Sequence, residues 1–241
     1  MKKRKGKKKF AWNPKSKVLY DIMASAPGVI GVNWAFQDIL GMDTSERWFK
    51  IGLDIALTLI LIPFLLFFFT FWPAVLFALV LAHTISWLFN GHFFDTVGRF
   101  HSLCKMTLGK MTVYLQGIEL RASTRNSLLS ILVIGGITRG QGIRDTSDVD
   151  IRFVRKKGFW NGLAANFWGM SERTRALFAK FPLDLYVYDD MKSLDRLRED
   201  EKPIIVYDPN GMLREKYKER GYMMLCDVMA KIWDEEGQKF V

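Results

Sequence analysis

Hydrophobic and polar residues are segregated along this chain. Residues 55–94 contain forty consecutive positions without an Asp, Glu, Lys or Arg. Because one membrane crossing needs about 20 apolar residues, the stretch predicts two helices, 51–69 and 72–89. Pro73 falls in the first turn of the second helix, where its missing N–H is tolerated. We therefore expect a hairpin that spans the bilayer or re-enters it. A buried hairpin in a soluble core is the less favoured alternative, because the apolar residues occupy every helix face.

The C-terminal part, 95–241, alternates between strand-like and helix-like patterns. Its apolar and period-2 segments predict strands at 127–134, 148–154, 183–188 and 204–207. Segments of helical spacing predict helices at 102–120, 159–180, 193–200, 212–220 and 223–236, with a short helix from about Thr138. We expect the helix 159–180 to restart at Ser171, with Glu172 as a charge at the new helix start. Such alternation indicates an α/β domain that follows the hairpin.

The charge distribution bears on orientation and on partners. The formal net charge is +10, yet 95–241 holds 24 basic and 20 acidic residues, whereas 1–17 holds nine basic residues and no acid. The body of the protein therefore shows no charge pattern for specific nucleic acid binding. The positive-inside rule predicts a two-pass membrane protein with both termini in the cytoplasm. We expect 1–50 to combine short interfacial helices with a basic tail that either touches anionic lipid or only aids solubility.

Three acidic residues mark the candidate chemistry of the C-terminal domain. Asp148 and Asp150 open one predicted strand and share one of its faces, and Asp184 lies within the next strand. Three converging carboxylates repel each other unless cations lie between them. Oxygen ligands of this kind suit Mg²⁺, and two such ions can stabilise the attacking and leaving oxygens of a phosphoryl transfer. Arg152 shares the same face and is either a structural counter-ion or a ligand-binding group.

A candidate phosphate site precedes these acids. Gly135 and Gly136 end the first predicted strand and allow close approach of the backbone to a phosphate. The start of a short helix behind them would favour negative charge. Arg139 and Arg144 can pair with phosphate oxygens. Cysteine and histidine add nothing to this picture, because none of them has metal-binding spacing.

The order Ile134-Gly135-Gly136, Asp148-Val149-Asp150-Ile151 and Asp184 resembles the nucleotidyltransferase superfamily, in particular its small, minimal members. The resemblance covers about a third of the chain. It implies a short mixed sheet flanked by helices, and Mg²⁺-dependent transfer of a nucleoside monophosphate from an NTP to an acceptor. Asp148 and Asp150 would bind two ions and Asp184 would complete one of them. Gly136 replaces the Ser of many members, and the hydroxyl of Thr138 could take its place.

These features lead to two hypotheses of different kinds. The first is a membrane-anchored nucleotidyltransferase whose acceptor is a membrane lipid, a lipid-linked precursor or a membrane-bound partner. The second is a catalytically silent nucleotide-binding module that regulates or scaffolds a membrane complex. The hairpin favours a membrane-borne acceptor, because a tether raises effective concentration only for a partner held in the same membrane.

Overall fold

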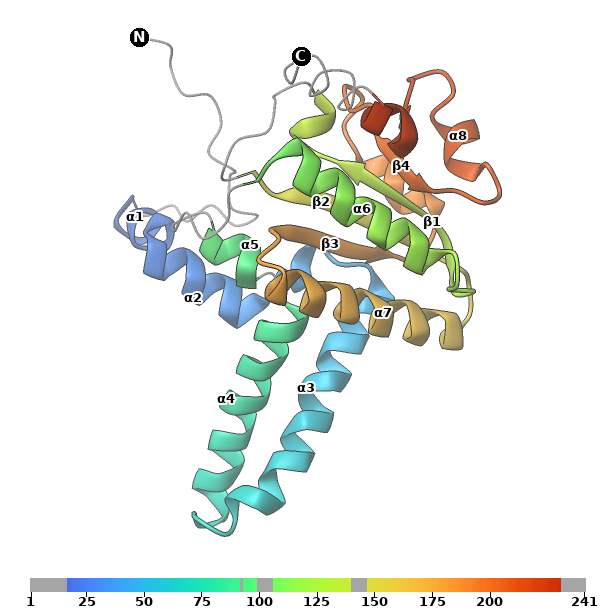
Figure 1. Cartoon of the computed structure of the whole chain (residues 1–241). Helices are drawn as coiled ribbons and strands as arrows, with labels where there is room; N and C mark the ends of the chain where they lie inside the picture. Colours follow the sequence, from blue (N-terminus) through green and yellow to red (C-terminus); the bar gives the residue numbers. More distant parts are fainter. Residues whose placement is uncertain (1–16, 92, 99–105, 140–146, 231–241) are drawn as a thin grey trace.

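The structure is a computed structural model that describes residues 17–91, 93–98, 106–139 and 147–230. It is a mixed α/β protein in which a long helical hairpin projects from a sheet-containing domain (Figure 1). The hairpin consists of α3 (Thr44–Leu65) and α4 (Phe71–Asn90). Both helices are long and apolar enough to cross a membrane, because the mean hydropathy of an 18-residue window is 1.9 in α3 and 1.7 in α4. Most of their large side chains are exposed in the protein itself, as lipid-facing residues would be.

The two predicted apolar helices are confirmed, and the first helix starts earlier than expected. It begins at Thr44, so its first two turns belong to the domain rather than to the apolar run. Pro73 does lie in the first turn of α4. Before the hairpin, the expected short helices are α1 (Lys17–Ala24), α2 (Ala26–Phe36) and the 3₁₀ turn η1 (Ile39–Gly41). The basic tail and the link after α5 (Phe93–Gly98) fall largely outside the described residues.

The domain is built on a five-stranded mixed sheet in the order β3-β2-β1-β4-β5. Its strands are β1 (Leu128–Ile134), β2 (Val149–Arg155), β3 (Leu183–Tyr188), β4 (Ile204–Tyr207) and β5 (Met223–Met224). β1 pairs antiparallel with β2 and β4, whereas β2–β3 and β4–β5 are parallel. The four predicted strands are confirmed. The start of the predicted last helix is wrong, because Met223–Met224 adds a fifth strand and the helix begins after it.

Helices cover both faces of the sheet unequally. α6 (Leu108–Ala122) and α7 (Phe159–Phe178) pack on one face, where Phe153 stacks on Trp168 with ring centroids 4.3 Å apart. Among the described helices, the 3₁₀ helix η3 (Met191–Arg196) and the short α8 (Met212–Lys216) pack against part of the other face. The first four residues of the predicted helix 102–120 lie outside the described residues. The helices predicted at 193–200 and 212–220 are shorter in the structure than expected. The thinner cover leaves part of this second face accessible.

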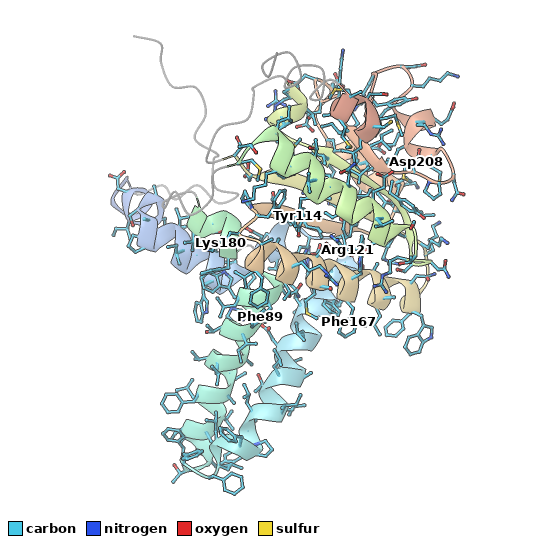
Figure 2. All side chains as sticks on the ribbon, in the orientation of Figure 1. Phe89, Tyr114, Arg121, Phe167, Lys180 and Asp208 are labelled. Carbon is cyan, nitrogen blue, oxygen red and sulfur yellow. The ribbon has the colours of Figure 1, made fainter. Side chains whose placement is uncertain are left out.

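α7 is one continuous helix, so the predicted restart at Ser171 is wrong. Glu172 is fully buried rather than solvated at a helix start. Its two carboxylate oxygens accept hydrogen bonds of 2.7 Å from Nε and Nη2 of Arg121 on α6. Figure 2 shows Arg121 and Tyr114 on α6 lying over α7. A bidentate, charge-assisted pair of this kind holds α6 and α7 together.

The hairpin and the domain are joined by the first turns of α3, which cover the free edge of β3. Glu46 Oε2 accepts a hydrogen bond from the backbone N–H of Val187 at 2.9 Å, and Asp43 Oδ2 accepts one from Asp189 at 2.9 Å. Arg173 of α7 forms an ion pair with Glu46 and donates to Asn90 Oδ1 of α4 at 2.7 Å. We call this group, Asp43, Glu46, Asn90, Arg173 and Asp189, the junction. It orients the sheet with β3 nearest the hairpin.

Candidate functional site

Two of the predicted acids lie side by side on the open face of the sheet. β2 and β3 run parallel, and Asp150 is in register with Asp184. Their side chains are only 14% and 9% exposed. Two carboxylates held this close in a half-closed environment repel each other when both are charged. Burial, followed by the charge of Asp184 and a hydrogen bond to it, raises the pKa of Asp150 to about 8.

Gly135 lies directly against Asp150. Its φ angle is +95°, a value that residues with a side chain rarely adopt. A Cβ atom at this position would lie 2.1 Å from Asp150 Oδ2. Glycine is therefore required at this position for two reasons: the positive φ angle of the backbone, and the space that the Asp150 carboxylate occupies. The following turn, η2 (Ile137–Arg139), keeps the loop compact, since the buried hydroxyl of Thr138 donates to the carbonyl of Gly135 at 2.9 Å.

Arg152 lies between the two carboxylates. Its Nη2 is 3.4 Å from Asp150 Oδ1 and 3.7 Å from Asp184 Oδ2. Its Nη1 donates to the carbonyl of Asp184 at 2.9 Å, and its guanidinium lies 4.5 Å from the ring centroid of Tyr186. Both alternatives considered for Arg152 therefore have a structural basis. It is a counter-ion to the acids, and it also faces the cavity.

The acids form one wall of a cavity of about 420 Å³. Four arginines from the described part of the chain line it, which makes it suited to an anionic ligand. Arg139 pairs with Glu201, and Arg196 contacts Asp43 at 2.8 Å. The Nε atoms of Arg139 and Arg152 are buried and make no hydrogen bond within the described part of the protein. The cavity-lining residues are Gly41, Ile134, Gly135, Arg139, Asp150, Arg152, Asp184, Tyr186, Tyr188, Arg196, Leu197, Arg198 and Glu201.

The predicted site residues are therefore only partly brought together. Gly135, Arg139, Asp150 and Asp184 line one cavity. Asp148 precedes β2 and is half-buried, close enough for its charge to raise the pKa of Asp150. Thr138 is buried and bonded to its own loop. Gly136 follows Gly135 in the turn, and Arg144 lies outside the described residues.

The donor set fits a divalent cation in part. Asp150 and Asp184 supply carboxylate oxygens in register. The raised pKa of Asp150 means that its charged form is disfavoured there, and a nearby positive charge would stabilise that form. Such hard oxygen donors suit Mg²⁺. Within the described residues, no group of three or more Asp, Glu, His or Cys is arranged to hold a metal. A cation would thus rest on two carboxylates, with further oxygens supplied by Asp148, solvent or substrate.

Sequence reasoning missed several cavity residues. Tyr186 and Tyr188 follow Asp184 at intervals of two on β3, so the alternation of the strand could have placed them on the same face. Arg196 ends the 3₁₀ helix η3 and Arg198 follows it, and no local pattern reveals the position of this turn. Gly41 comes from the segment before the hairpin, and a Cβ there would approach the Tyr186 ring at 3.8 Å. The segment that precedes the hairpin therefore contributes directly to the cavity wall.

Comparison with known proteins gives no assignment: no protein-family model, curated protein or solved structure matches this chain.

Proposed function

We propose that this protein is a membrane-anchored nucleotidyltransferase that transfers a nucleoside monophosphate, or a related phospho-group, from an NTP to an acceptor at the cytoplasmic membrane face. The observation that carries the proposal is the pairing of Asp150 with Asp184 beside Gly135, in a cavity lined by four arginines. Acids and arginines in one concave site suit a ligand that combines phosphates with a divalent cation.

Each group has a defined role in this proposal. Asp150 and Asp184, helped by Asp148, would hold Mg²⁺, which when bound supplies charge neutralisation for the phosphates. Arg139, Arg196 and Arg198 bind the phosphate oxygens of the donor. Gly135 keeps the backbone clear of Asp150, so that the carboxylate faces the cavity. Arg152 fixes the Asp184 carbonyl and limits repulsion between the acids.

The position of the sheet favours a membrane-borne acceptor. β3 is the sheet edge that the junction fixes to the hairpin, and β2 is next to it. Asp184 on β3 and Asp150 on β2 are therefore on the two strands nearest the hairpin and the proposed membrane. Neighbouring strands lie only about 4.8 Å apart. A lipid-linked or head-group acceptor held in the bilayer can reach this part of the domain more readily than the outer strands.

The test uses the full chain in lipid nanodiscs with Mg²⁺ and each α-labelled NTP, followed by extraction of lipids and separation of proteins. Label in the lipid or protein fraction is expected for the wild type and not for Asp150→Asn or Asp184→Asn. Asp195→Asn is the matched control, because Asp195 is a 66% exposed acid that pairs with Lys216 away from the cavity. Equal transfer by all four proteins would overturn the assignment.

The full chain is needed for a structural reason. A fragment that begins after the hairpin would lack Glu46 and leave Arg173 buried without its partner. The acceptor is therefore tested by composition rather than by truncation. Nanodiscs with and without extracted cellular lipid are compared with a water-soluble acceptor pool. Transfer to the water-soluble acceptors that is equal with and without the cellular lipid, and no transfer to lipid, would exclude a membrane-borne acceptor. It would not exclude nucleotidyltransferase activity.

The second candidate function, a silent nucleotide-binding module, has one observation in its favour. Arg152 already provides positive charge to both acids without a metal. This reading predicts nucleotide binding that is unchanged by removal of divalent cations with EDTA, together with no transferred label. Binding that requires Mg²⁺ and transfer into an extractable product would exclude it.

The proposed topology is a two-pass arrangement with both termini in the cytoplasm. It is supported by the basic residues at the chain start and by the two candidate crossings. Cysteines introduced by Lys5→Cys and Lys239→Cys, in a chain lacking Cys104 and Cys226, should react alike with an impermeant reagent in sealed vesicles. Opposite accessibility would mean an odd number of crossings.

A further inference from the structure

The outer face of α7 lacks the polarity expected of a helix on a water-soluble domain. Three of its polar residues, Asn166, Glu172 and Arg173, instead point inward beside buried apolar residues of the same helix and are at most 5% exposed. Its outward face instead presents large apolar side chains, with Trp160 76%, Phe167 48% and Phe178 75% exposed. A helix in water buries its apolar side and exposes its polar side. α7 is therefore suited to an apolar surrounding on its outer face.

Most other positions on this outer face are uncharged. At 3.6 residues per turn, the residues between these aromatic positions on the same side are Leu163, Ala164, Met170, Ser171 and Thr174, and the one charged side chain beside them is Arg175, 56% exposed in the last turn of the helix. Basic residues stand at its two ends instead. Lys157 is exposed just before the helix, and Lys180 is exposed just after it. Long basic side chains at the ends of an apolar face are typical of helices that lie at a membrane surface.

α7 crosses the head of the hairpin, where α3 and α4 enter the domain (Figure 1). The ring of Phe167 meets that of Phe49 on α3 edge-on, with centroids 4.8 Å apart. The ring of Phe178 lies 6.5 Å from that of Phe89 on α4, and Thr174 donates to the Phe89 carbonyl at 3.1 Å. Figure 2 shows Phe89 and Phe167 together at this level. The outer face of α7 is thus continuous with the apolar surface of the hairpin.

The length of the hairpin sets the depth of α7. From Phe71 near the tip to Phe89, α4 rises about 27 Å at 1.5 Å per residue. The hydrocarbon core of a bilayer is about 30 Å thick. A hairpin that spans this core therefore places Phe89, and with it α7, at the boundary between acyl chains and head groups. Trp48, 66% exposed beside Phe49, lies at the same boundary, where tryptophan is enriched.

A groove between α3 and α7 extends this surface inward. It has a volume of about 510 Å³. Trp48, Phe49, Leu53, Phe159, Leu163 and Phe167 supply most of its apolar lining. Its polar lining includes Asn166, whose buried Oδ1 has no hydrogen-bond partner among the described residues. An apolar groove with one unpaired acceptor fits a lipid chain whose polar end carries a hydroxyl or amide donor.

We propose that α7 is an interfacial membrane helix whose outer face is embedded in the cytoplasmic leaflet, and that an acyl chain of that leaflet fills the α3–α7 groove. The inference does not depend on catalysis, but only on the hairpin crossing a bilayer. Lipid is favoured over a second copy because this face is continuous with the lipid-facing surface of the hairpin. The hairpin alone would tether the domain to the membrane. An embedded α7 would in addition hold the domain against the membrane surface.

The test measures membrane depth at single spin labels on the full chain in phosphatidylcholine–phosphatidylglycerol vesicles. Cys104→Ser and Cys226→Ser provide the background for Trp160→Cys, Phe167→Cys and Phe178→Cys. The matched control is Leu120→Cys, because Leu120 on α6 is 75% exposed and away from the hairpin. We expect the α7 labels to collide at least several-fold more with oxygen, and less with a water-soluble nickel reagent, than the label at 120.

Two outcomes would overturn the proposal. Nickel accessibility at 160, 167 and 178 equal to that at 120 would place α7 in water. Dipolar broadening that disappears when labelled chains are diluted with unlabelled chains would show that a second copy covers this face. Unchanged thermal unfolding of each labelled chain confirms that the variants are folded. Because no nucleotide is added, failure of this proposal and failure of the proposed enzyme activity are distinguishable.

Discussion

The junction and the candidate site both place acids next to a buried arginine, yet they differ in how the charges are matched. At the junction, Glu46 is completely buried, and its two oxygens accept from Arg173 and from the Val187 N–H. At the site, Asp150 and Asp184 face each other, and Arg152 stays 3.4 and 3.7 Å away. The matched charges of the junction hold two parts of the chain together. At the site, two acids share one arginine, so part of their negative charge is left for a cationic ligand to compensate.

The largest expected effect is the loss of the junction cation. Arg173→Met should leave the buried carboxylate of Glu46 without its ion-pair partner, which costs about 3–5 kcal/mol. Thermal unfolding in nanodiscs measures it, with Arg198→Met as the control, since Arg198 is 67% exposed and pairs with the exposed Asp200. The control should change stability by less than about 0.5 kcal/mol. Similar losses in both variants would contradict a special role for the junction.

A second test concerns the glycine that supports the site. Gly135→Ala should displace Asp150, because the new Cβ would lie 2.1 Å from its Oδ2 and the φ angle of +95° is unfavourable. We expect a destabilisation of about 1–3 kcal/mol and loss of Mg²⁺-dependent nucleotide binding. Gly31→Ala is the control, because its Cβ meets nothing within 4 Å. Intact binding in Gly135→Ala would show that the loop does not shape the site.

A third test makes the same acid-to-amide change in both regions. Glu46→Gln should destabilise the protein, whereas Asp150→Asn should leave it unchanged or stabilise it by about 1 kcal/mol without divalent cations, because repulsion with Asp184 is removed. A raised pKa means that wild-type stability falls as pH rises from about 4, the unfolded value, towards 8. The advantage of Asp150→Asn should therefore grow over this range. Destabilisation by both changes would mean that the site is a second structural ion pair.

The smallest effect is expected from acidification of the junction. Burial opposes ionisation of Asp189, but hydrogen bonds from Ser45 and Arg155 outweigh it, so its pKa is lowered. The stabilising contribution is present above the unfolded pKa of about 3.9 and is lost as pH falls from that value through the lowered folded pKa. Asp189→Asn should cost a few tenths of a kcal/mol at pH 7 and less at pH 3. A cost that is as large at pH 3 as at pH 7 would assign the effect to packing instead of charge.

Local spacing in the sequence determined a large part of this architecture. The uncharged run of forty residues indicates apolar helices, and period-2 alternation in β2 and β3 fixes which side chains share a face. Gly135 and the acids could be found for the same reason, since turn chemistry and strand alternation act over a few residues. Tyr186 was within reach of that reasoning too, because it follows Asp184 by two positions.

Only the tertiary structure decided what each charge does. Glu172 looked like a helix-start charge, but the arginine that buries it lies 51 residues earlier, on α6. Arg173 resembles an ordinary helix residue in the sequence, and its partner Glu46 is 127 positions away on α3. Which side of α7 faces outward is likewise invisible to a pattern that assumes water on the polar side. Spacing fixes periodicity, whereas charge pairing and burial depend on which distant segments pack together, and no local rule specifies that.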